Sequence, residues 1–435
     1  MNIKVGQLLN RIPYRLIPVI GRKYCSFRRL IKSYDSSSDR EEWIFRGVLE
    51  VVTFAYDNIP FFKEFYDSKS FHPSCLQSFG DIKKIPVMGK DDLVGVDLEL
   101  RSFRTSSSYK ATTGGSSGKT LAFYKDRAHQ IKEMAFYHNA WAALGYSKDK
   151  VRLQFAGRTD KTGISYDLKR NQLRVSAYVP VKDVLAALKD INSNGVVQYL
   201  HGYPSVIYDF ALCCEGNPQM YEDSNLKKSL CGVFLNSEYP QPHQRKAIEE
   251  VLNVKTIASY GHTEGAGLAF DYGDGMYHVN QAYGYLEIVE IDGESHLVAT
   301  SYDNFASPFV RYDTGDVVSD FRYDANILGE FRLDTGGRVS DFLLDKKGNQ
   351  LPLTGVIFGK HHRLFEYCKQ VQIYQPMEGY ATVLYVPKND LPENFSASEY
   401  FDSEGLDVEF EFKQISSPIR TKSGKVLLKV RDINH

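Results

Sequence analysis

At 435 residues the chain exceeds the size at which one hydrophobic core keeps growing, so we expect a large domain and a smaller one. With 43% hydrophobic and 25% charged residues, the composition excludes a long disordered arm. The formal net charge of −1 leaves no global field to attract nucleic acid, and no apolar run approaches the roughly 20 residues of a membrane-spanning helix. The six cysteines form no Cys-x-x-Cys pair and follow no secretory leader, which favours reduced thiols and a cytoplasmic location.

The first feature in chain order is a basic and apolar segment at residues 5–31. Leucine, isoleucine and valine alternate there with arginine and lysine, a composition that suits the surface of an anionic bilayer. Pro13, Pro18 and Gly21 interrupt any long amphipathic helix. Packing on the protein surface is therefore favoured over a weak peripheral contact with a membrane.

Helices and strands alternate through the middle of the chain. Residues 40–66 have helical spacing, and Pro60 breaks that run. Short apolar runs follow at residues 196–200, 232–235 and 256–260. This alternation predicts an α/β architecture whose sheets are covered on both faces. From Gly284 onward strands alternate and turn at Asp292-Gly293, which predicts a β-rich subdomain.

A cluster of turn-forming residues at 334–338 marks the expected boundary between domains. Fresh strands are predicted beyond it, near residues 371–373, 382–386 and 408–412. We therefore expect an amino-terminal domain of residues 1–336 and a small α+β carboxy-terminal domain of residues 337–435.

A stretch rich in glycine and hydroxyl groups is the strongest local signal of chemistry. It consists of Thr113, Gly114, Gly115, Ser116, Ser117, Gly118 and Lys119. Glycines permit close backbone approach, and amides and hydroxyls can surround a phosphate. A Walker A loop needs glycine at the position of Thr113, so the P-loop NTPase pattern fails by one residue. Alone, such a stretch is equally typical of a solvated loop.

Four further segments follow this loop in chain order. They are Tyr260-Gly261-His262-Thr263-Glu264, residues 308–316, Gly337-Arg338 and residues 418–425. Singly, they read as strands entering turns or as an exposed basic loop. In this order they resemble the phenylacetate-CoA ligase and CapK branch of the adenylate-forming enzymes, a resemblance that runs from about residue 57 to residue 425.

The resemblance implies an adenylate-forming enzyme fold: a large α/β domain with a β-rich subdomain, a small mobile α+β lid, and an ATP site. Residues 113–119 would bind phosphates, Tyr260 beside Gly261 would stack on or border adenine, and Thr263 would contact the α-phosphate. Glu264 would ligate Mg²⁺, which agrees with the preference of a hard cation for carboxylate oxygen.

The resemblance also assigns contacts with ribose and adenine. Asp316 would bind both ribose hydroxyls, and Arg338, at the hinge between domains, would also reach the ribose. Adenine is expected near Asn236, Ser237 and Glu238. Asp313 stands where many relatives carry arginine, so no arginine role is carried to that position.

A lysine near the carboxyl end completes the expected site. Lys425, with Lys422 as the fallback, matches the family lysine that bridges the carboxylate and the α-phosphate during adenylation. A mobile cation suits a transition state in which negative charge moves toward pyrophosphate. Ser340 occupies the position of the usual hinge aspartate, so the sequence does not decide whether the lid rotates between the half-reactions. Residues 201–205 resemble a segment near the acyl pocket, although His201 is equally typical of a structural histidine.

The predicted activity is an ATP-dependent, AMP-forming ligase that activates a carboxylic acid as its acyl-adenylate, with Lys425, Glu264 and Thr263 as catalytic residues. Coenzyme A is the expected acceptor, and an amine on a sugar or amino acid is the alternative, since CapK-like relatives are associated with capsule or O-antigen synthesis. A non-catalytic nucleotide-binding scaffold and a P-loop NTPase are the competing hypotheses. The sequence does not identify the acid. It also does not decide the oligomeric state, and a homodimer is one alternative because relatives are often dimers.

Overall fold

The computed structural model describes residues 3–18, 20–113, 121–156, 163–176, 179–338, 342–357, 363–388, 391–392, 394–420, 426–430 and 433, with the backbone alone at 334–338, 350, 352, 354 and 355. The chain divides into two compact units. The first comprises Met1–Ala156, Lys161–Thr314 and Val318–Arg332, and the second comprises Gly157–Asp160, Gly315–Val317 and Leu333–His435. The predicted α/β class, with a large domain and a small carboxy-terminal one, is confirmed. The boundary predicted at 336/337 lies within a strand, a few residues from this division.

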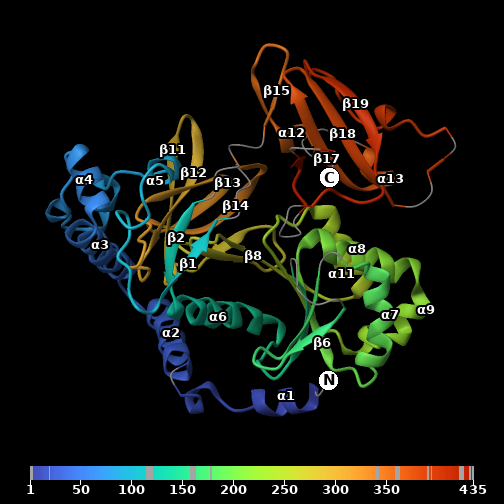
Figure 1. Cartoon of the computed structure of the whole chain (residues 1–435), viewed down its shortest axis with the longest axis horizontal. Coiled ribbons are helices and arrows are strands. Elements are labelled where there is room, and N and C mark those ends of the chain that lie inside the picture. Colours follow the sequence, from blue (N-terminus) through green and yellow to red (C-terminus); the bar gives the residue numbers. More distant parts are fainter. Residues whose placement is uncertain are drawn as a thin grey trace. The chain divides into compact units, whose positions relative to one another are not determined.

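A 12-stranded mixed sheet dominates the described chain (Figure 1). In spatial order its strands are β11 (Gly284–Ile291), β12 (Glu294–Ser301), β13 (Tyr312–Asp324), β14 (Ile327–Arg338), β10 (Tyr277–Val279), β9 (Leu268–Asp271), β8 (Thr256–Gly261), β7 (Gly232–Asn236), β6 (Val197–Gly202), β3 (Val151–Ala156), β5 (Gln172–Ser176) and β4 (Ser165–Asp167). Neighbours from β8 through β5 run parallel, and β9, β10 and β14 continue antiparallel. The three apolar runs predicted as strands are β6, β7 and β8.

The helices of the first unit follow the predicted pattern. They are α1 (Ile3–Asn10), α2 (Ile20–Asp35), α3 (Arg40–Asn58), α4 (Pro60–Ser68), α5 (Lys90–Val94), α6 (Arg127–Trp141), α7 (Val181–Ile191), α8 (Pro204–Gly216), α9 (Pro218–Asp223), α10 (Leu226–Ser229) and α11 (Pro242–Leu252), with single 3₁₀ turns at Tyr14–Leu16, Pro73–Cys75, Phe79–Lys84 and Ala142–Leu144. The carboxylate of Asp39 starts α3 by accepting a hydrogen bond from the amide of Glu42 at 2.9 Å. Pro60, whose fixed φ suits a first helical turn, starts α4. The predicted break at Pro60 is confirmed.

Aromatic packing fixes α6 against the parallel strands. Trp141, at the end of α6, stacks on Phe234 of β7 with ring centroids 4.2 Å apart and planes 9° apart. Tyr199 of β6 stacks on the same ring at 5.0 Å. Fully burying a side chain such as that of Phe234 contributes about 1.5–3 kcal/mol. This cluster therefore holds α6 at the strands whose ends carry the predicted motifs.

A separate hairpin precedes α6. Strands β1 (Ser108–Thr112) and β2 (Ala122–Asp126) pair antiparallel, from Ser108 opposite Asp126 to Thr112 opposite Ala122. Beyond the ladder, Thr113 and Leu121 bond to each other: the Thr113 amide donates to the Leu121 carbonyl at 2.9 Å, and the Leu121 amide donates to Oγ1 of Thr113 at 3.0 Å. The predicted phosphate loop therefore joins two antiparallel strands, whereas a Walker A loop joins a strand to a helix.

The β-rich part of the first unit contains the predicted hairpin. Strands β11 and β12 pair from Gly284 opposite Ser301 to Ile291 opposite Glu294. Asp292 and Gly293 form the turn with φ of 51° and 84°. Positive φ at both central residues is the turn geometry that an Asp-Gly pair favours. The prediction of a β-rich subdomain after Gly284 is confirmed.

The second unit is built on a four-stranded sheet in the order β19 (Glu409–Gln414), β18 (Tyr380–Pro387), β17 (Cys368–Met377) and β20 (Lys429–Val430). A two-stranded ribbon, β15 (Phe342–Leu344) with β16 (Gln350–Pro352), the short helices α12 (Leu353–Ile357) and α13 (Leu364–Tyr367), and a 3₁₀ turn at Ala397–Glu399 complete it. Leu343, Leu353, Val371, Ile373 and Val383 are among the side chains of its core. This α+β unit has its own hydrophobic core, as a separate domain requires.

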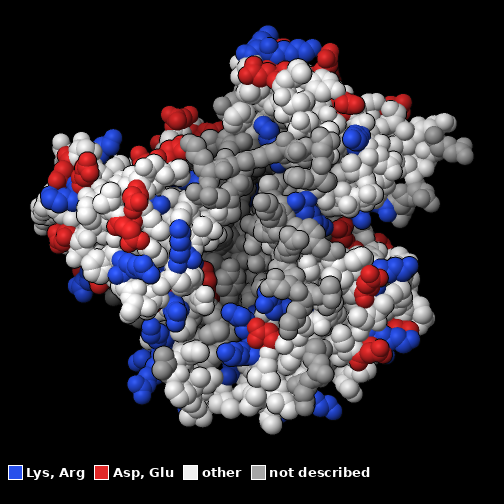
Figure 2. All heavy atoms as spheres, in the orientation of Figure 1, with Lys and Arg blue, Asp and Glu red and all other residues white. Residues whose placement is uncertain are grey.

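The charged residues are spread over the surface. In Figure 2, Lys and Arg lie among Asp and Glu over most of the visible face, as expected for a net charge near zero. No helix within the described ranges is long and apolar enough to cross a membrane.

Candidate active site

The carboxyl ends of three adjacent parallel strands bring separate sequence motifs together. Strand β6 leads into residues 203–205, β7 ends at Asn236, and β8 ends at Gly261. The register places Gly202 opposite Leu235 and Asn236 opposite Ser259. In open α/β sheets, ligands bind outside the carboxyl ends of the strands. The segment near the predicted acyl pocket, the predicted adenine segment and the tyrosine motif therefore share one sheet edge.

A tight turn after β8 presents the tyrosine motif. The Gly265 amide donates to the His262 carbonyl at 3.0 Å, and Gly265 has φ of 70°. This φ favours glycine. A Cβ atom at Gly265 would lie 2.2 Å from Nε2 of His129, so glycine is required by space as well as by conformation. Thr263 is exposed on the turn, whereas Glu264 is buried.

Glu264 contacts residues from two motifs. Its Oε2 lies 3.3 Å from Nδ1 of His262, and its Oε1 accepts a hydrogen bond from the Tyr312 hydroxyl at 3.4 Å. Tyr312 belongs to the segment at residues 308–316 and begins β13. Both contacts are longer than a strong hydrogen bond to a carboxylate.

A buried lysine joins the loop hairpin to the tyrosine motif. Lys125, on β2, donates from Nζ to the backbone carbonyl of Thr263 at 3.0 Å, and only 5% of the residue is exposed. The same Nζ lies 3.6 Å from the carboxylate of Glu133. Because β2 directly follows the predicted phosphate loop, this contact fixes the hairpin that carries the loop against the turn that carries Thr263 and Glu264.

A polar network behind the turn holds this lysine. Oε1 of Glu133 lies 3.5 Å from Nε2 of His129, which is hydrogen-bonded to the hydroxyl of Tyr283 at 3.0 Å. Burial lowers the pKa of His129 against the opposing effect of Glu133. Burial alone would raise the pKa of Glu133, but His129 and Lys125 together bring it down to about 2. A carboxylate that stays ionised at neutral pH thus faces Lys125.

Residues 236–238 have a strained and partly structural arrangement. Ser237 is exposed and has φ of 67°, a left-handed conformation that is uncommon for serine. The carboxylate of Glu238 accepts a hydrogen bond from the amide of Ser205 at 3.2 Å, near the start of α8. A negative charge at a helix amino terminus is favourable, so Glu238 has a role in the fold beside the contact with adenine predicted for this segment.

Two predicted residues lie in packed surroundings. Tyr260 is buried, with its ring edge-to-face on Phe331 at 5.4 Å. His201 is buried with its ring 5.1 Å from that of Trp141, and burial lowers its pKa well below 6.5. The expected contact between Tyr260 and adenine stays a prediction. His201 packs on Trp141, but its buried Nδ1 has no hydrogen-bond partner among the described residues.

The segment at residues 308–316 is anchored by an ion pair and by a hydrogen bond to a histidine. Arg311 is buried, has φ of 42°, and reaches both carboxylate oxygens of Glu287 at 2.8 and 3.0 Å. Asp313 pairs with Nδ1 of His296 at 3.0 Å. The aspartate that replaces the arginine of many relatives therefore has a partner of its own. Asp316 is half-buried within β13, and its contact with ribose stays a prediction.

Several predicted residues fall outside what the structure describes. Residues 114–120, Lys422 and Lys425 lie in undescribed segments, and Arg338 has a described backbone only. Sequence reasoning missed Lys125, Glu133 and His129 and gave Tyr312 no role. The one available signal was a lysine directly after the apolar run Leu121 to Tyr124, where a buried charged side chain needs a partner.

The donor set fits Mg²⁺ only in combination with phosphate. The described residues contain no group of three histidine, cysteine, aspartate or glutamate side chains able to hold a metal ion. Mg²⁺ is commonly held by one or two carboxylates together with substrate phosphates and water. The single carboxylate of Glu264, beside the hairpin of the predicted phosphate loop, agrees with that pattern.

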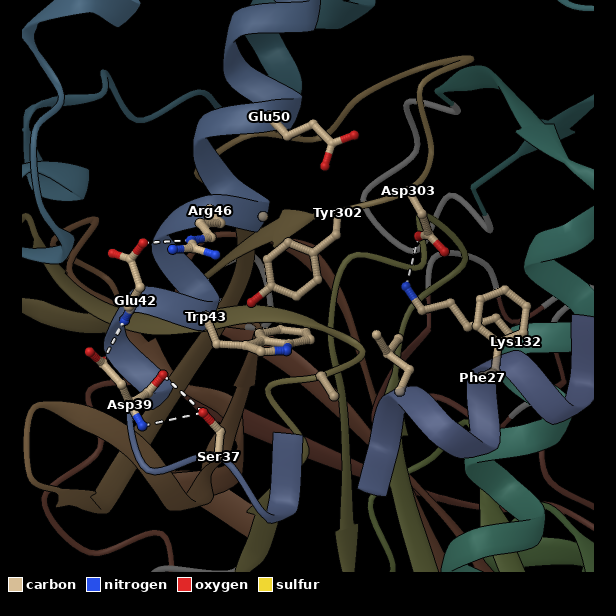
Figure 3. A pocket seen from close by; sticks show the side chains of 13 residues that line it. Phe27, Ser37, Asp39, Glu42, Trp43, Arg46, Glu50, Lys132, Tyr302 and Asp303 are labelled. Atoms are coloured by element: carbon tan, nitrogen blue, oxygen red, sulfur yellow. Dashed lines mark hydrogen bonds and ion pairs between the residues drawn. The ribbon is translucent and has the colours of Figure 1, made fainter. Parts of the chain in front are cut away.

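A cavity of about 580 Å³ lies elsewhere in the first unit, between α2, α3 and the first half of α6 (Figure 3). Trp43 and Tyr302 form part of its wall with ring centroids 5.5 Å apart. On the opposite side Lys132 pairs with Asp303 at 2.7 Å and donates to the carbonyl of Tyr283. None of the predicted site residues lines this cavity. Its link to the site is indirect: Tyr283, which Lys132 contacts, also bonds to His129 in the network behind Lys125.

The sequence of the chain is similar to those of two known proteins. No family model matches the chain. It is 26% identical to the protein CapK of Staphylococcus aureus over 249 residues, which are 55% of this chain and 54% of CapK, so that match spans about half of the relative. It is 25% identical to the phenylacetate-coenzyme A ligase of Pseudomonas putida over 323 residues, which are 68% of this chain and 70% of that enzyme.

A solved structure extends the comparison to the fold. The 2-hydroxyisobutyryl-CoA ligase in the postadenylation state, in complex with R3-HIB-AMP, matches 91% of this chain and 90% of that chain with a TM-score of 0.66 and 17% identity. The fold is thus that of the adenylate-forming enzymes. In sequence, the chain is similar to CapK and to phenylacetate-coenzyme A ligase, the branch that its motifs resemble.

Proposed function

We propose that the chain is an ATP-dependent, AMP-forming ligase that activates a carboxylic acid as its acyl-adenylate and passes the acyl group to coenzyme A. The observation that carries this proposal is that direct contacts join three other segments to the tyrosine motif. Lys125 binds the Thr263 carbonyl, Tyr312 reaches Glu264, and β7 lies beside β8. These contacts link Lys125 and Tyr312 to the turn at the carboxyl end of β8, the side on which ligands bind in open α/β sheets.

In the first half-reaction, a carboxylate oxygen of the acid attacks the α-phosphorus of ATP in line with the departing pyrophosphate. The bond from the α-phosphorus to the bridging oxygen breaks, and acyl-AMP and pyrophosphate result. Residues 113–119 would surround the phosphates with amides and hydroxyls. Thr263, which is exposed on the turn after β8, would orient the α-phosphate, and Lys425 would offset the charge that moves toward pyrophosphate. Mg²⁺, held through Glu264, would supply further neutralisation of phosphate charge.

In the second half-reaction, a nucleophile attacks the acyl carbon and AMP leaves. The names of two relatives, phenylacetate-coenzyme A ligase and 2-hydroxyisobutyryl-CoA ligase, support coenzyme A as the acceptor. A role in capsule polysaccharide synthesis, with an amine as acceptor, rests on the likeness to CapK. Under that alternative, an amine and not the thiol would accelerate AMP release.

The test is acid-dependent exchange of labelled pyrophosphate into ATP, with a panel of aryl acids, amino acids and uronic acids. Glu264→Gln and Lys425→Ala are compared with Glu250→Gln and Lys246→Ala, two exposed residues of α11 that serve as matched controls. We expect exchange with one class of acid, and a loss of at least about a hundredfold in the two site variants alone.

Product analysis discriminates the competing hypotheses. A ligase releases AMP and pyrophosphate, whereas a P-loop NTPase would release ADP and phosphate. ATP binding without exchange for any acid, and without either set of products, would favour the non-catalytic scaffold and contradict the proposal.

A further inference from the structure

The outward face of the amino-terminal segment exposes an unusual number of large apolar side chains. Thirteen such side chains are exposed in the described chain, and six of them lie within its first 20 residues. They are Val5, Leu8, Leu9, Ile12, Leu16 and Ile20. Leu168 is also exposed, and its carbonyl accepts a hydrogen bond from Asn10 at 3.0 Å, so it extends the same face. Exposed apolar groups gathered in this way mark an interaction surface.

Basic residues are interspersed with these apolar ones, and acidic residues are not. Between Ile3 and Tyr34 the sequence contains no aspartate or glutamate. Seven of its lysine and arginine residues are exposed: Lys4, Arg11, Arg15, Arg22, Lys23, Arg29 and Lys32. Figure 2 shows blue groups at the lower left, where Figure 1 has α2, without red among them. The face is therefore apolar and positively charged, on a chain whose net charge is −1.

The inner side of the segment is fixed to the first unit. Gly6 packs so closely on Tyr166 that a Cβ atom would lie 1.7 Å from its hydroxyl. Tyr14 stacks on Tyr24 at 3.7 Å, and its hydroxyl contacts the sulfur of Met134. Pro13 and Pro18 flank the 3₁₀ turn that separates α1 from α2, as the sequence predicted, whereas Gly21 lies within α2 and does not interrupt it. The apolar residues above thus point outward because other residues already fill the inward positions.

We propose that this amino-terminal face, residues 4–32 with Leu168, docks the protein on an anionic lipid surface. Leucine and isoleucine would enter the boundary between headgroups and acyl chains, while arginine and lysine would bind lipid phosphates. A protein partner fits less well, because the cores of protein interfaces are depleted in lysine and enriched in aromatic residues, and the exposed apolar residues of this face are all aliphatic. The inference is independent of the proposed ligase activity.

The test is cosedimentation of the full chain with vesicles of phosphatidylcholine alone or of phosphatidylcholine with an equal part of phosphatidylglycerol. We expect binding to the anionic vesicles alone, weakening as salt rises. The double variant Leu8→Glu/Leu16→Glu should lower the partition coefficient by about a hundredfold, because two inserted side chains are lost. Arg11→Glu/Arg15→Glu should lower it by about thirtyfold or more.

A matched control is available on the second unit. Met377 is 65% exposed, as is Leu16, so Met377→Glu places the same charge at an equally exposed apolar position. It should leave vesicle binding unchanged. Substitutions at such exposed positions leave the fold intact, which the melting temperature of each variant checks. Failure of the unmodified chain to bind anionic vesicles at low salt would overturn the proposal.

Two further outcomes would also overturn it. If Leu8→Glu/Leu16→Glu converts a dimer to a monomer in light scattering, the face is an interface between copies of the chain. If the chain binds neutral and anionic vesicles equally, the charge has no part in docking.

Discussion

Substituting Gly265 by alanine tests whether the turn after β8 is as tightly enclosed as its geometry indicates. Gly265 has φ of 70°, where an L-residue is disfavoured by about 1 kcal/mol. Its new Cβ atom would also lie 2.2 Å from Nε2 of His129. The His129 ring is buried and hydrogen-bonded to Tyr283, so it cannot withdraw without loss. Overpacking of this kind costs about 1–3 kcal/mol. We expect Gly265→Ala to lower the free energy of unfolding by about 2–4 kcal/mol.

The chain provides a control that separates the two contributions. Gly293, in the turn between β11 and β12, has φ of 84°, and a Cβ atom there would meet nothing within 4 Å. Gly293→Ala therefore carries the conformational cost without the close contact, and we expect a loss of about 1 kcal/mol. The reduced entropy of the unfolded chain is common to both variants and cancels in the comparison.

The assay is urea unfolding followed by tryptophan fluorescence. The chain has two tryptophans, Trp43 and Trp141, and both lie in the first unit, so the signal reports the unit that contains both glycines. The additional variant His129→Ala in the Gly265→Ala background should recover part of the loss by removing the close neighbour. Equal losses for Gly265→Ala and Gly293→Ala would refute the reasoning about space.

Three other predictions concern charged groups. Arg311→Met should lower the free energy of unfolding by about 3–5 kcal/mol, because it leaves the Glu287 carboxylate buried without its partner. Arg311→Lys should not restore the bidentate pair. A loss below ~1 kcal/mol for Arg311→Met would contradict this prediction. Burial brings the pKa of His138 to about 3 and that of His201 well below 6.5, so the unfolded chain binds more protons than the folded chain. The free energy of unfolding should therefore fall by up to about 2.7 kcal/mol per pH unit as the pH drops below 6.5. A flat profile of this free energy between pH 7 and pH 5 would refute the prediction. Lys125→Met should slow pyrophosphate exchange by about tenfold to a hundredfold by releasing the motif turn, and an unchanged rate would show that this contact has no part in positioning.

The fold could be predicted from the sequence largely because its strands are locally marked. Buried parallel strands read as continuous apolar runs, and the runs at 196–200, 232–235 and 256–260 became three neighbours in one sheet. Asp292-Gly293 marked a hairpin through its turn chemistry alone. The division between the units is less marked, because β14 runs continuously through it and no break in local structure announces a boundary.

The exposure of the amino-terminal face was not predictable in the same way. The sequence showed apolar and basic residues in alternation, and surface packing was the favoured interpretation. That interpretation holds for Gly6, Tyr14 and Tyr24, which face inward. Which residues of a short amphipathic helix face the protein depends on what the rest of the chain places beneath it, here the hydroxyl of Tyr166 and the sulfur of Met134. Local sequence carries no information about those partners.

The residues of the candidate site also fall into two groups, those that a sequence motif marks and those that only the folded chain reveals. Thr263 and Glu264 could be identified because a motif of five adjacent residues carries them. Lys125 could not, because its role arises from a hydrogen bond to a backbone carbonyl 138 residues away. Every residue has such a carbonyl, so the partner leaves no mark in the sequence. A motif therefore marks the groups that we propose to contact substrate, whereas the residues that position those groups appear only once the chain is folded. It follows that substitutions around Lys125 and His129, outside every motif, should alter activity as strongly as some substitutions within them.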